Sequence, residues 1–321
     1  MMNKFQKFLR KSTRDQAAAI LKTTRAGARA VSHFVLVRIV RRLFASRFGR
    51  DVIFFSHPND ALMVATTEEG LHYVVHAADQ MIGRNVFCYQ QSFDRQNLKS
   101  AVEILGKDKK ILLDVGANIG TIGIFAVSQR LFSRCIAIEP DPKNFWLLRA
   151  NVALNDVSEC FDLHNFALSD SGNGTLDFEL SEENFGDHRV RICEAAGRFE
   201  EQNRRVIRVE KQTLDALCQG VALDECVLFM DTQGHEGHVL AGALSLLRAG
   251  VPIVTEFWPY GLMRAEGLER FYKAIESGSY TGLYDLRYPD KRIEFSLRAI
   301  QHIADELQQS GRHTDLVLVR E

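Results

Sequence analysis

From about residue 106 to its C-terminus, the chain alternates short apolar runs with longer amphipathic stretches. The apolar runs predict strands, and the amphipathic stretches predict helices. Strands that alternate with helices of about 10 to 15 residues favour parallel βαβ units, and therefore a doubly wound α/β sheet. The predicted strands are 111–114, 135–139, 161–166, 227–231, 252–256, 280–287 and 315–319, and the predicted helices are 119–129, 142–154, 235–247, 266–277 and 296–309.

Two segments depart from this alternation. Residues 51–105 contain β-prone pieces, separated by turn signals such as 57–60, and then a predicted helix. Residues 169–210 contain turn residues and short polar strands, which indicate a hairpin or a lid. The chain therefore divides into a basic helical arm at 1–50, a small β/α elaboration at 51–105 and a main α/β domain at 106–321. The β-prone pieces are 51–55, 62–66, 72–76 and 86–89.

Residues 1–50 differ from the rest of the chain in charge. They contain 13 of the 40 Lys and Arg residues but only one of the 41 acids, so they carry +12 and the remainder carries −13. Apolar side chains recur at helical spacing among the basic ones, which predicts a basic amphipathic helix. A helix on an anionic membrane surface, an organelle transit peptide and an arm packed on the main domain all fit this pattern. A nucleic-acid partner fits least, because the acidic remainder does not extend the basic patch and would repel phosphates.

Neither a membrane span nor a secretory signal is indicated. The most apolar early stretch, 31–40, contains His33 and Arg38 and is too short to cross a bilayer. The six cysteines form no zinc-binding or disulfide pattern. We therefore expect a cytoplasmic protein, with peripheral membrane contact through residues 1–50 left open. The oligomeric state is not predicted.

The loop that follows the first predicted strand, residues 114–120, is rich in glycine. Gly116 and Gly120 allow a tight turn and a close approach of the backbone to a ligand. A nicotinamide-binding fingerprint would place glycines at 116, 118 and 121, whereas this chain has Asn118 and Thr121. The spacing therefore disfavours a dinucleotide site, and an ordinary strand-to-helix turn is the remaining alternative.

The next two predicted strands end in residues that suit a nucleoside. Glu139, followed by Pro140, ends the second strand 19 residues beyond Gly120. A carboxylate at this position can accept hydrogen bonds from both hydroxyls of a ribose. The third strand ends with Phe166 and Ala167, which offer an apolar wall at the height of an adenine ring.

Several motifs occur in order along the chain. They are DVGANIG (114–120), IEPDP (138–142), FALSD (166–170), TLD (213–215), MDTQGHEGHVLAGA (230–243) and VTEFWP (254–259). Together they resemble the FkbM family of S-adenosylmethionine-dependent methyltransferases, and the similarity extends over residues 79–319.

This resemblance implies a class I methyltransferase (Rossmann-like) fold, with a doubly wound sheet of seven strands of which the last is antiparallel. It also implies that residues 106–321 are the methyltransferase domain and that S-adenosylmethionine lies across the ends of the first strands. A ribose-binding acid without phosphate-binding glycines suits this cofactor, which has one ribose and no pyrophosphate. The residues implied are Asp114, Gly116, Asn118 and Gly120 for the methionine part, Glu139 for the ribose, Phe166 and Ala167 for the adenine, and Ala117 and Pro140 in the same loops.

The fourth predicted strand brings Asp231 to the position from which a methyltransferase reaches its acceptor. The turn at 231–234 is acidic and non-aromatic, which favours a hydroxyl acceptor over a base nitrogen. Since a hydroxyl must lose its proton to become a good nucleophile, a carboxylate or histidine is needed nearby. The catalytic candidates are Asp231, His235, Glu236 and Glu256.

We therefore predict O-methylation of a hydroxyl on a glycan or small metabolite. A NAD-type Rossmann oxidoreductase and a non-enzymatic membrane-surface adaptor with a degenerate core are the alternatives. Asp231, His235 and His238 together could ligate a metal, but the His-Glu-x-His spacing is not that of the zinc motif, so we assign no metal.

Overall fold

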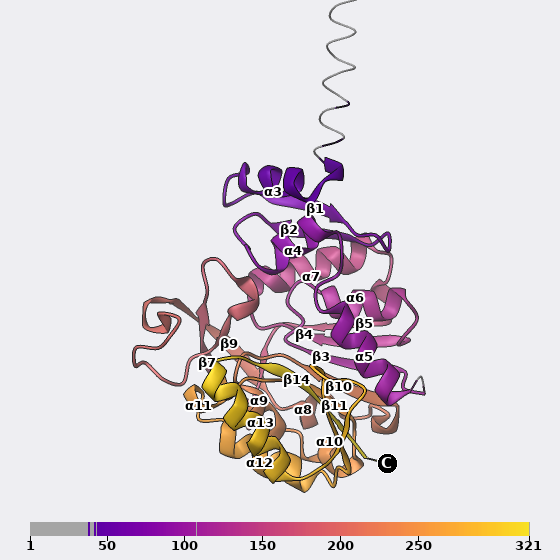
Figure 1. Cartoon of the computed structure of the whole chain (residues 1–321), viewed down its shortest axis with the longest axis vertical. Helices are drawn as coiled ribbons and strands as arrows, with labels where there is room; N and C mark the ends of the chain where they lie inside the picture. The colour runs from indigo at the N-terminus through magenta and orange to yellow at the C-terminus, as the bar shows by residue number, and fades with distance from the viewer. Residues whose placement is uncertain (1–37, 39–41, 43, 107, 321) are drawn as a thin grey trace, which may run out of the picture. The chain divides into compact units, whose positions relative to one another are not determined.

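The structure, a computed structural model, describes residues 38, 42, 44–106 and 108–320. Two compact units, residues 1–56 and 57–321, make up the chain (Figure 1). Most of the predicted arm at 1–50 lies outside the described residues. The three interpretations of this arm, as a membrane-surface helix, a transit peptide or a packed arm, therefore concern residues that the structure does not describe. Within the described ranges, no helix has the length and apolarity needed to cross a membrane.

Helix α3 (Arg47–Phe55) belongs to the first unit. The Ser46 side chain caps its N-terminus by accepting a hydrogen bond of 3.0 Å from the backbone of the first turn. The strand predicted at 51–55 is therefore wrong, because the capped helix includes those residues. Phe48 and Val52, one helical turn apart, are exposed.

Within the described residues, the main sheet of the second unit has eight strands. Seven of them have the predicted arrangement, in which the last strand, β14, is antiparallel to both of its neighbours and the rest are parallel. The predicted α/β fold is thus confirmed, and the short edge strand β13 is an addition that the sequence analysis did not include. In spatial order the strands are β13 (Arg292–Glu294), β12 (Gly282–Asp285), β14 (Thr314–Val319), β11 (Ile253–Phe257), β10 (Cys226–Met230), β3 (Ile111–Val115), β4 (Arg134–Ile138) and β5 (Phe161–His164).

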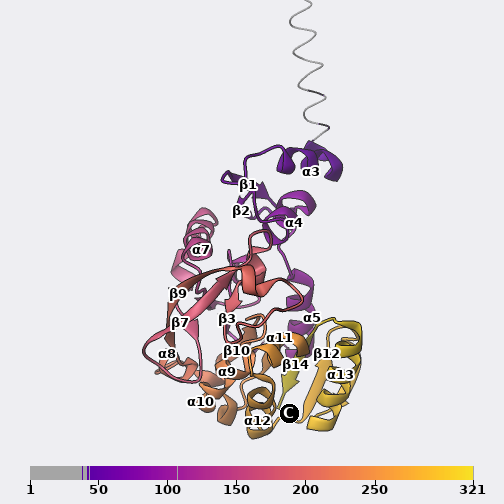
Figure 2. The same ribbon diagram turned by 90° about the vertical axis from the view of Figure 1, so that its left-hand side faces the viewer.

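Helices cover both faces of this sheet (Figure 2). One face carries a large apolar core, and the central strands place side chains such as Leu113, Leu228 and Ile253 in it. The predicted helix at 235–247 is divided in two at Gly242, whose position is so close to the Ser169 carbonyl that an added Cβ would lie 2.2 Å from it. The helices are α5 (Arg95–Leu105), α6 (Thr121–Ser128), α7 (Pro142–Leu154), α8 (Leu214–Leu217), α9 (Glu236–Ala241), α10 (Leu244–Ala249), α11 (Pro259–Arg264), α12 (Leu268–Ser277) and α13 (Leu297–Ser310).

The insertion at 169–210 forms the expected hairpin. Its two long strands pair antiparallel from Thr175 opposite Glu210 to Leu180 opposite Arg205. A short strand on either side completes a second, smaller sheet. Its strands are β6 (Ala167–Leu168), β9 (Arg205–Gln212), β7 (Thr175–Leu180) and β8 (Arg189–Val190) in spatial order.

The elaboration before the main sheet is partly as predicted. Strands β1 (Leu62–Thr66) and β2 (His72–His76) pair antiparallel over the predicted residues. The strand predicted at 86–89 is wrong, because these residues belong to helix α4 (Ile82–Tyr89). The buried Asp79 carboxylate accepts hydrogen bonds from backbone N–H groups at the start of this helix, which favours the helical conformation.

Asn151 connects three parts of this unit. It is fully buried on α7, its Oδ1 accepts from Val74 N at 2.6 Å, and its Nδ2 donates to the carbonyls of Val74 at 3.2 Å and Ile119 at 2.9 Å. The side chain therefore fastens β2 to α7 and to the loop before α6.

We predict that Asn151→Ala destabilises the protein by about 1–3 kcal/mol per buried group left without a partner. Chemical denaturation followed by circular dichroism measures this loss. Arg149→Ala, at an exposed position of the same helix, should change the free energy of unfolding by less than about 0.5 kcal/mol. Equal losses in the two variants would contradict the role assigned to Asn151.

Candidate active site

The loop after β3 lies directly against the end of β10. Gly116 has φ +89°, and a Cβ added there would lie 1.8 Å from the carbonyl oxygen of Asp231. Gly116 and Ala117 both donate their backbone N–H to the Ile138 carbonyl at 3.0 Å. The loop thus contacts the ends of both neighbouring strands, and only a glycine fits at this contact.

Glu139 is buried between two loops at the end of β4. Its Oε2 accepts from Asn118 N at 2.9 Å, and its Oε1 accepts from Asp141 N at 2.8 Å. Burial, reinforced by the nearby Asp141 carboxylate, raises the pKa of Glu139 to about 8. The backbone N–H groups fix the position of the carboxyl group and leave its remaining lone pairs available to a ligand.

A cavity with about 600 Å³ of empty space lies over the ends of these strands. Of the predicted cofactor residues, Gly116, Asn118, Glu139, Pro140 and Ala167 line it. The structure therefore brings together residues from the loop after β3, the loop after β4 and strand β6.

The other predicted cofactor residues do not line this cavity. Asp114 is buried and accepts from Gly123 N at 3.1 Å, and burial raises its pKa to about 7. Gly120 is the N-cap residue of α6, and Ala117 is buried in the loop. The Phe166 ring lies 5.4 Å from the His164 ring and packs against the apolar core.

The hairpin insertion supplies a wall that the sequence analysis did not identify. Phe178, Phe185, His188 and Val190 line the cavity. The Phe185 carbonyl accepts from the Asn118 side chain at 2.9 Å, which ties the insertion to the glycine-rich loop. Burial is the main reason that the pKa of His188 falls to about 3, so its ring is neutral. Phe178 and Phe185, two of the three phenylalanines of the insertion, were the available sequence signal.

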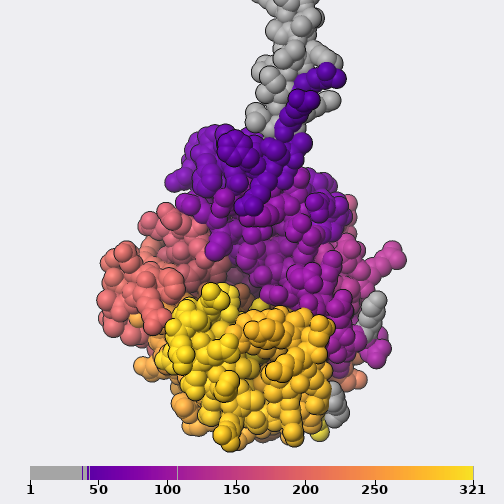
Figure 3. Space-filling model, in the orientation of Figure 1, coloured from indigo at the N-terminus to yellow at the C-terminus, as the bar shows by residue number. Residues whose placement is uncertain are grey.

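A second, more open cavity adjoins the first (Figure 3). It contains about 1680 Å³ of empty space, including open solvent, and Asp231 lines both cavities together with Ile82 and Gly186. In Figure 3 the surface is hollowed where purple, salmon and yellow residues meet. Asp231 is thus the acid at the junction of the two cavities.

Carboxylates from the ends of β10, β11 and β14 and from the start of α5 gather in this second cavity. Asp94, Asp231, Glu256 and Asp315 all line it, and Glu256 pairs directly with Asp315 across β11 and β14. Gln233 Nε2 donates to Asp231 Oδ1 at 2.8 Å and to Glu256 Oε2 at 3.1 Å. The structure therefore places the predicted candidates Asp231 and Glu256 side by side.

Burial raises the pKa of each of these acids, and the neighbouring carboxylates add to the effect on three of them. The pKa rises to about 7 for Asp94 and to about 8 for Asp315, in both cases with a contribution from Asp231. The pKa values of Asp231 and Glu256 are also raised, for Glu256 with a contribution from Asp231.

Glu236 and His235 lie at the start of α9. Glu236 is fully buried, and its Oε1 accepts from Thr232 N, Thr232 Oγ1 and Gly234 N at 2.9, 2.9 and 3.2 Å. His235 lines the first cavity, and burial lowers its pKa well below the usual value, so its ring is neutral.

The histidine-containing metal set considered from the sequence is not formed. The His235 and His238 rings are stacked 4.4 Å apart and nearly parallel, and His238 Nε2 bonds the Ala265 carbonyl at 2.7 Å. Among the described residues, the group with the geometry of a metal site consists instead of Asp231, Glu236 and Glu256.

Comparisons with known proteins agree with the sequence motifs. Residues 114–275 match the family model described as the methyltransferase FkbM domain. Among curated proteins, the chain is 28% identical over 171 residues to the 2-O-methyltransferase NoeI of Sinorhizobium fredii, covering 50% of this chain and 68% of that protein.

Solved structures give more distant matches. The putative transferase PH0793 of Pyrococcus horikoshii is 16% identical, with a TM-score of 0.40 and coverage of 82% of this chain and 72% of that one. The methyltransferase FkbM of Methylobacillus flagellatus is also 16% identical, with a TM-score of 0.40 and coverage of 66% and 44%. TYW2 of M. jannaschii, solved with AdoMet, is 12% identical, with a TM-score of 0.41 and coverage of 83% and 89%.

The contact between Gly116 and the end of β10 gives a second prediction. Gly116→Ala should cost about 1–2 kcal/mol for its positive φ and a further ~1–3 kcal/mol for the clash with the Asp231 carbonyl. Gly220→Ala is the control, because the exposed Gly220 also has a positive φ, +79°, but has nothing within 4 Å of an added Cβ. Chemical denaturation of both variants measures the difference, and equal losses would show that the contact is not tight.

Proposed function

Since the chain belongs to the FkbM methyltransferase family, we propose that it transfers a methyl group from S-adenosylmethionine to a hydroxyl of a glycan or small metabolite. The observation that carries this proposal is the junction of two cavities at Asp231. One cavity is lined by a buried acid and aromatic rings, and the other is open and acidic. A methyl donor in the first and an acceptor in the second would meet at this residue.

The residues of the first cavity fit S-adenosylmethionine. Glu139 would accept hydrogen bonds from the ribose hydroxyls, and the apolar and aromatic side chains Ala167, Phe178 and Phe185 would enclose the adenine. When bound, this cofactor supplies a methyl group on a positively charged sulfur. The acidic surroundings of Asp231 suit that charge.

The open cavity fits a neutral hydroxyl compound better than a nucleic acid. Its carboxylates would repel phosphate groups. The curated relative NoeI is named as a 2-O-methyltransferase, which supports an oxygen acceptor for this chain as well.

Asp231 is best placed to act on the acceptor. In the proposed reaction, the acceptor hydroxyl gives its proton to the Asp231 carboxylate, and its oxygen forms a bond to the methyl carbon. The bond between that carbon and sulfur breaks, and its electron pair stays on sulfur, which becomes neutral. Glu236 holds the turn that positions Asp231, since its Oε1 binds Thr232 and Gly234. His235 faces the first cavity, on the donor side.

We predict that S-adenosylmethionine binds to the purified chain and that Glu139→Gln weakens this binding at least tenfold, or by about 1.4 kcal/mol. The amide keeps the size of the side chain but removes one acceptor oxygen. Isothermal titration calorimetry measures the affinity. Asp162→Asn is the control: Asp162 lies on β5 and forms an exposed ion pair with Arg134 of β4, so this variant should bind as the wild type does. Absence of binding heat for the wild-type protein would refute the cofactor assignment.

For catalysis, we expect Asp231→Asn to reduce methyl transfer by about 10²–10⁴-fold, the usual contribution of a general base. The affinity for S-adenosylmethionine should change by no more than about threefold, or ~0.7 kcal/mol. In the assay, the protein is incubated with methyl-labelled S-adenosylmethionine and with cell extract, which supplies the acceptor. Mass spectrometry then identifies the methylated atom. Asp177→Asn, on an exposed part of β7, is the control. Methylation found only on nitrogen, or a fully active Asp231→Asn, would overturn the proposal.

A further inference from the structure

We propose that Asp231, Glu236 and Glu256 bind a divalent metal ion at the junction of the two cavities. The inference deepens the proposed function, because it places a cation beside the proposed acceptor oxygen. The site differs from the one considered from the sequence, since it contains carboxylates alone.

The three carboxylates converge although they come from different elements. Asp231 follows β10, Glu256 lies on β11 and Glu236 is in the first turn of α9. One oxygen atom of each lies within 4.8 Å of the others. Carboxylate oxygens are the preferred ligands of hard divalent cations such as Mg²⁺, Mn²⁺ and Ca²⁺.

Glu236 provides independent support for a ligand. Its Oε1 accepts three hydrogen bonds from the turn at Thr232 and Gly234, whereas its fully buried Oε2 has no hydrogen-bond partner. A buried carboxylate oxygen without a partner is costly. The hydrogen bonds to Oε1 fix the carboxyl group, and a metal ion would supply the partner that its second oxygen lacks.

Further acids near the cluster add negative charge that a cation would offset. Asp94 and Asp315 line the same open cavity as Asp231 and Glu256, and the polar partner of Asp315 there is a neutral amide, Asn97 Nδ2, which donates to Asp315 Oδ2 at 2.6 Å. Among the described residues, the ion-pair partner of the three carboxylates is the exposed His313, whose Nε2 lies 4.0 Å from Glu256 Oε1.

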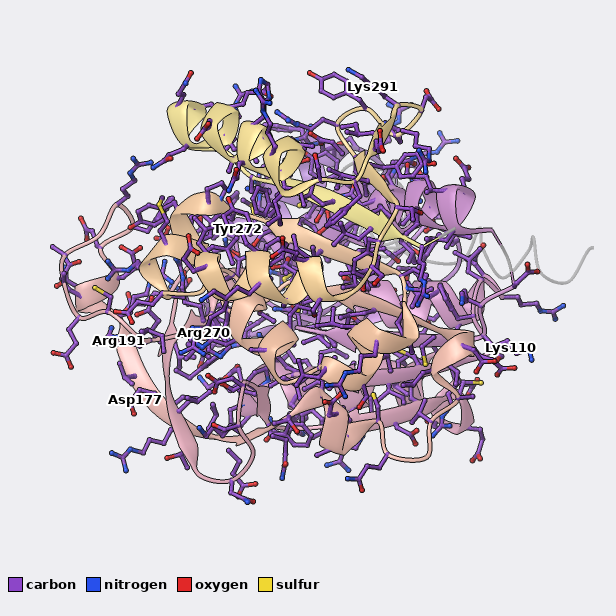
Figure 4. The ribbon with its side chains drawn as sticks, turned by 90° about the horizontal axis from the view of Figure 1, so that it is seen from below. Lys110, Asp177, Arg191, Arg270, Tyr272 and Lys291 are labelled. Atoms are coloured by element: carbon purple, nitrogen blue, oxygen red, sulfur yellow. The ribbon has the colours of Figure 1, made fainter. Side chains whose placement is uncertain are left out.

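Two acids of the hairpin insertion, the buried Glu179 and the partly buried Asp187, show the contrast. Glu179 pairs with Arg191 at 2.9 Å, and Asp187 pairs with Arg189 and Arg204; Arg191 is labelled in Figure 4. There the chain supplies arginines for its acids, as burial of charge requires. At Asp231, Glu236 and Glu256 it supplies none within ion-pair distance among the described residues, and a metal ion would take that role.

A cation at this position has a defined chemical use. It would stabilise the negative charge that develops on the acceptor oxygen as the proton leaves. Gln233 now bridges Asp231 and Glu256 through its Nε2. Rotation of this amide would turn its carbonyl oxygen toward the ion as a further ligand.

To test the proposal, the full chain is first dialysed against EDTA and is then titrated with Mn²⁺. Electron paramagnetic resonance follows the loss of the free Mn²⁺ signal, and Mg²⁺ competition tests whether the site accepts other hard cations. We expect one ion per chain, and at least tenfold weaker binding in Glu236→Gln and Glu256→Gln. Glu225→Gln is the matched control, because Glu225 precedes β10 at the end opposite Asp231 and pairs with the exposed Lys110 (Figure 4). It should bind Mn²⁺ as the wild type does.

The outcomes separate this inference from the proposed function. No saturable Mn²⁺ binding by the wild type below about 1 mM, the weak end of protein Ca²⁺ sites, would overturn the inference. In that case a proton shared between the carboxyl groups, or the positive charge of the cofactor, compensates Asp231, Glu236 and Glu256. If EDTA then leaves methyl transfer unchanged, the proposed function stands without the metal site. Mn²⁺ binding without any methyl transfer would instead support the metal site and count against the proposed function.

Discussion

The contact between Gly116 and the backbone of Asp231 is the constraint on which the site depends. Because no side chain intervenes, the loop after β3 and the end of β10 lie against each other. That contact brings Gly116, which lines the first cavity, next to Asp231, which lines both cavities. A side chain at residue 116 would separate the two strand ends and, with them, the two cavities.

The buried acids of this protein are stabilised in different ways, and the differences follow their positions. Backbone N–H groups from two loops hold Glu139. Arginines hold Glu179 and Asp187 in the insertion. Both arrangements compensate buried charge with groups from the chain itself. Asp231, Glu256 and Asp315 line the open cavity and, among the described residues, have no arginine or lysine within ion-pair distance, so compensation of their charge is left to whatever occupies that cavity. This is the property expected of a reactive site rather than of a structural one.

The sequence predicted the strands of the main sheet well, because buried parallel strands and the turns after them have strong local signals. Helix α7 has the predicted bounds, since Asp141 caps it and Pro142 begins it. The predictions at 51–55 and 86–89 were wrong because the apolar residues there suit a strand or a helix equally well. Ser46 caps the helix that contains 51–55, and Asp79 accepts hydrogen bonds at the start of the helix that contains 86–89, so both segments are helical. The aromatic wall of the first cavity could not be predicted, because it depends on how the insertion folds back over the sheet.

Asp79 shows why the two cavities are not independent. Its carboxylate accepts from Phe185 N at 3.3 Å as well as from the start of α4, and Gln80 N donates to the Glu183 carbonyl at 2.8 Å. These bonds join the elaboration to the insertion where Ile82 and Gly186 line both cavities. Because Ile82 and Gly186 belong to both cavities, a substitution at either residue would change the shape of both at once. Phe199 and Glu200 line the open cavity without lining the first, so substitutions there would change the open cavity alone.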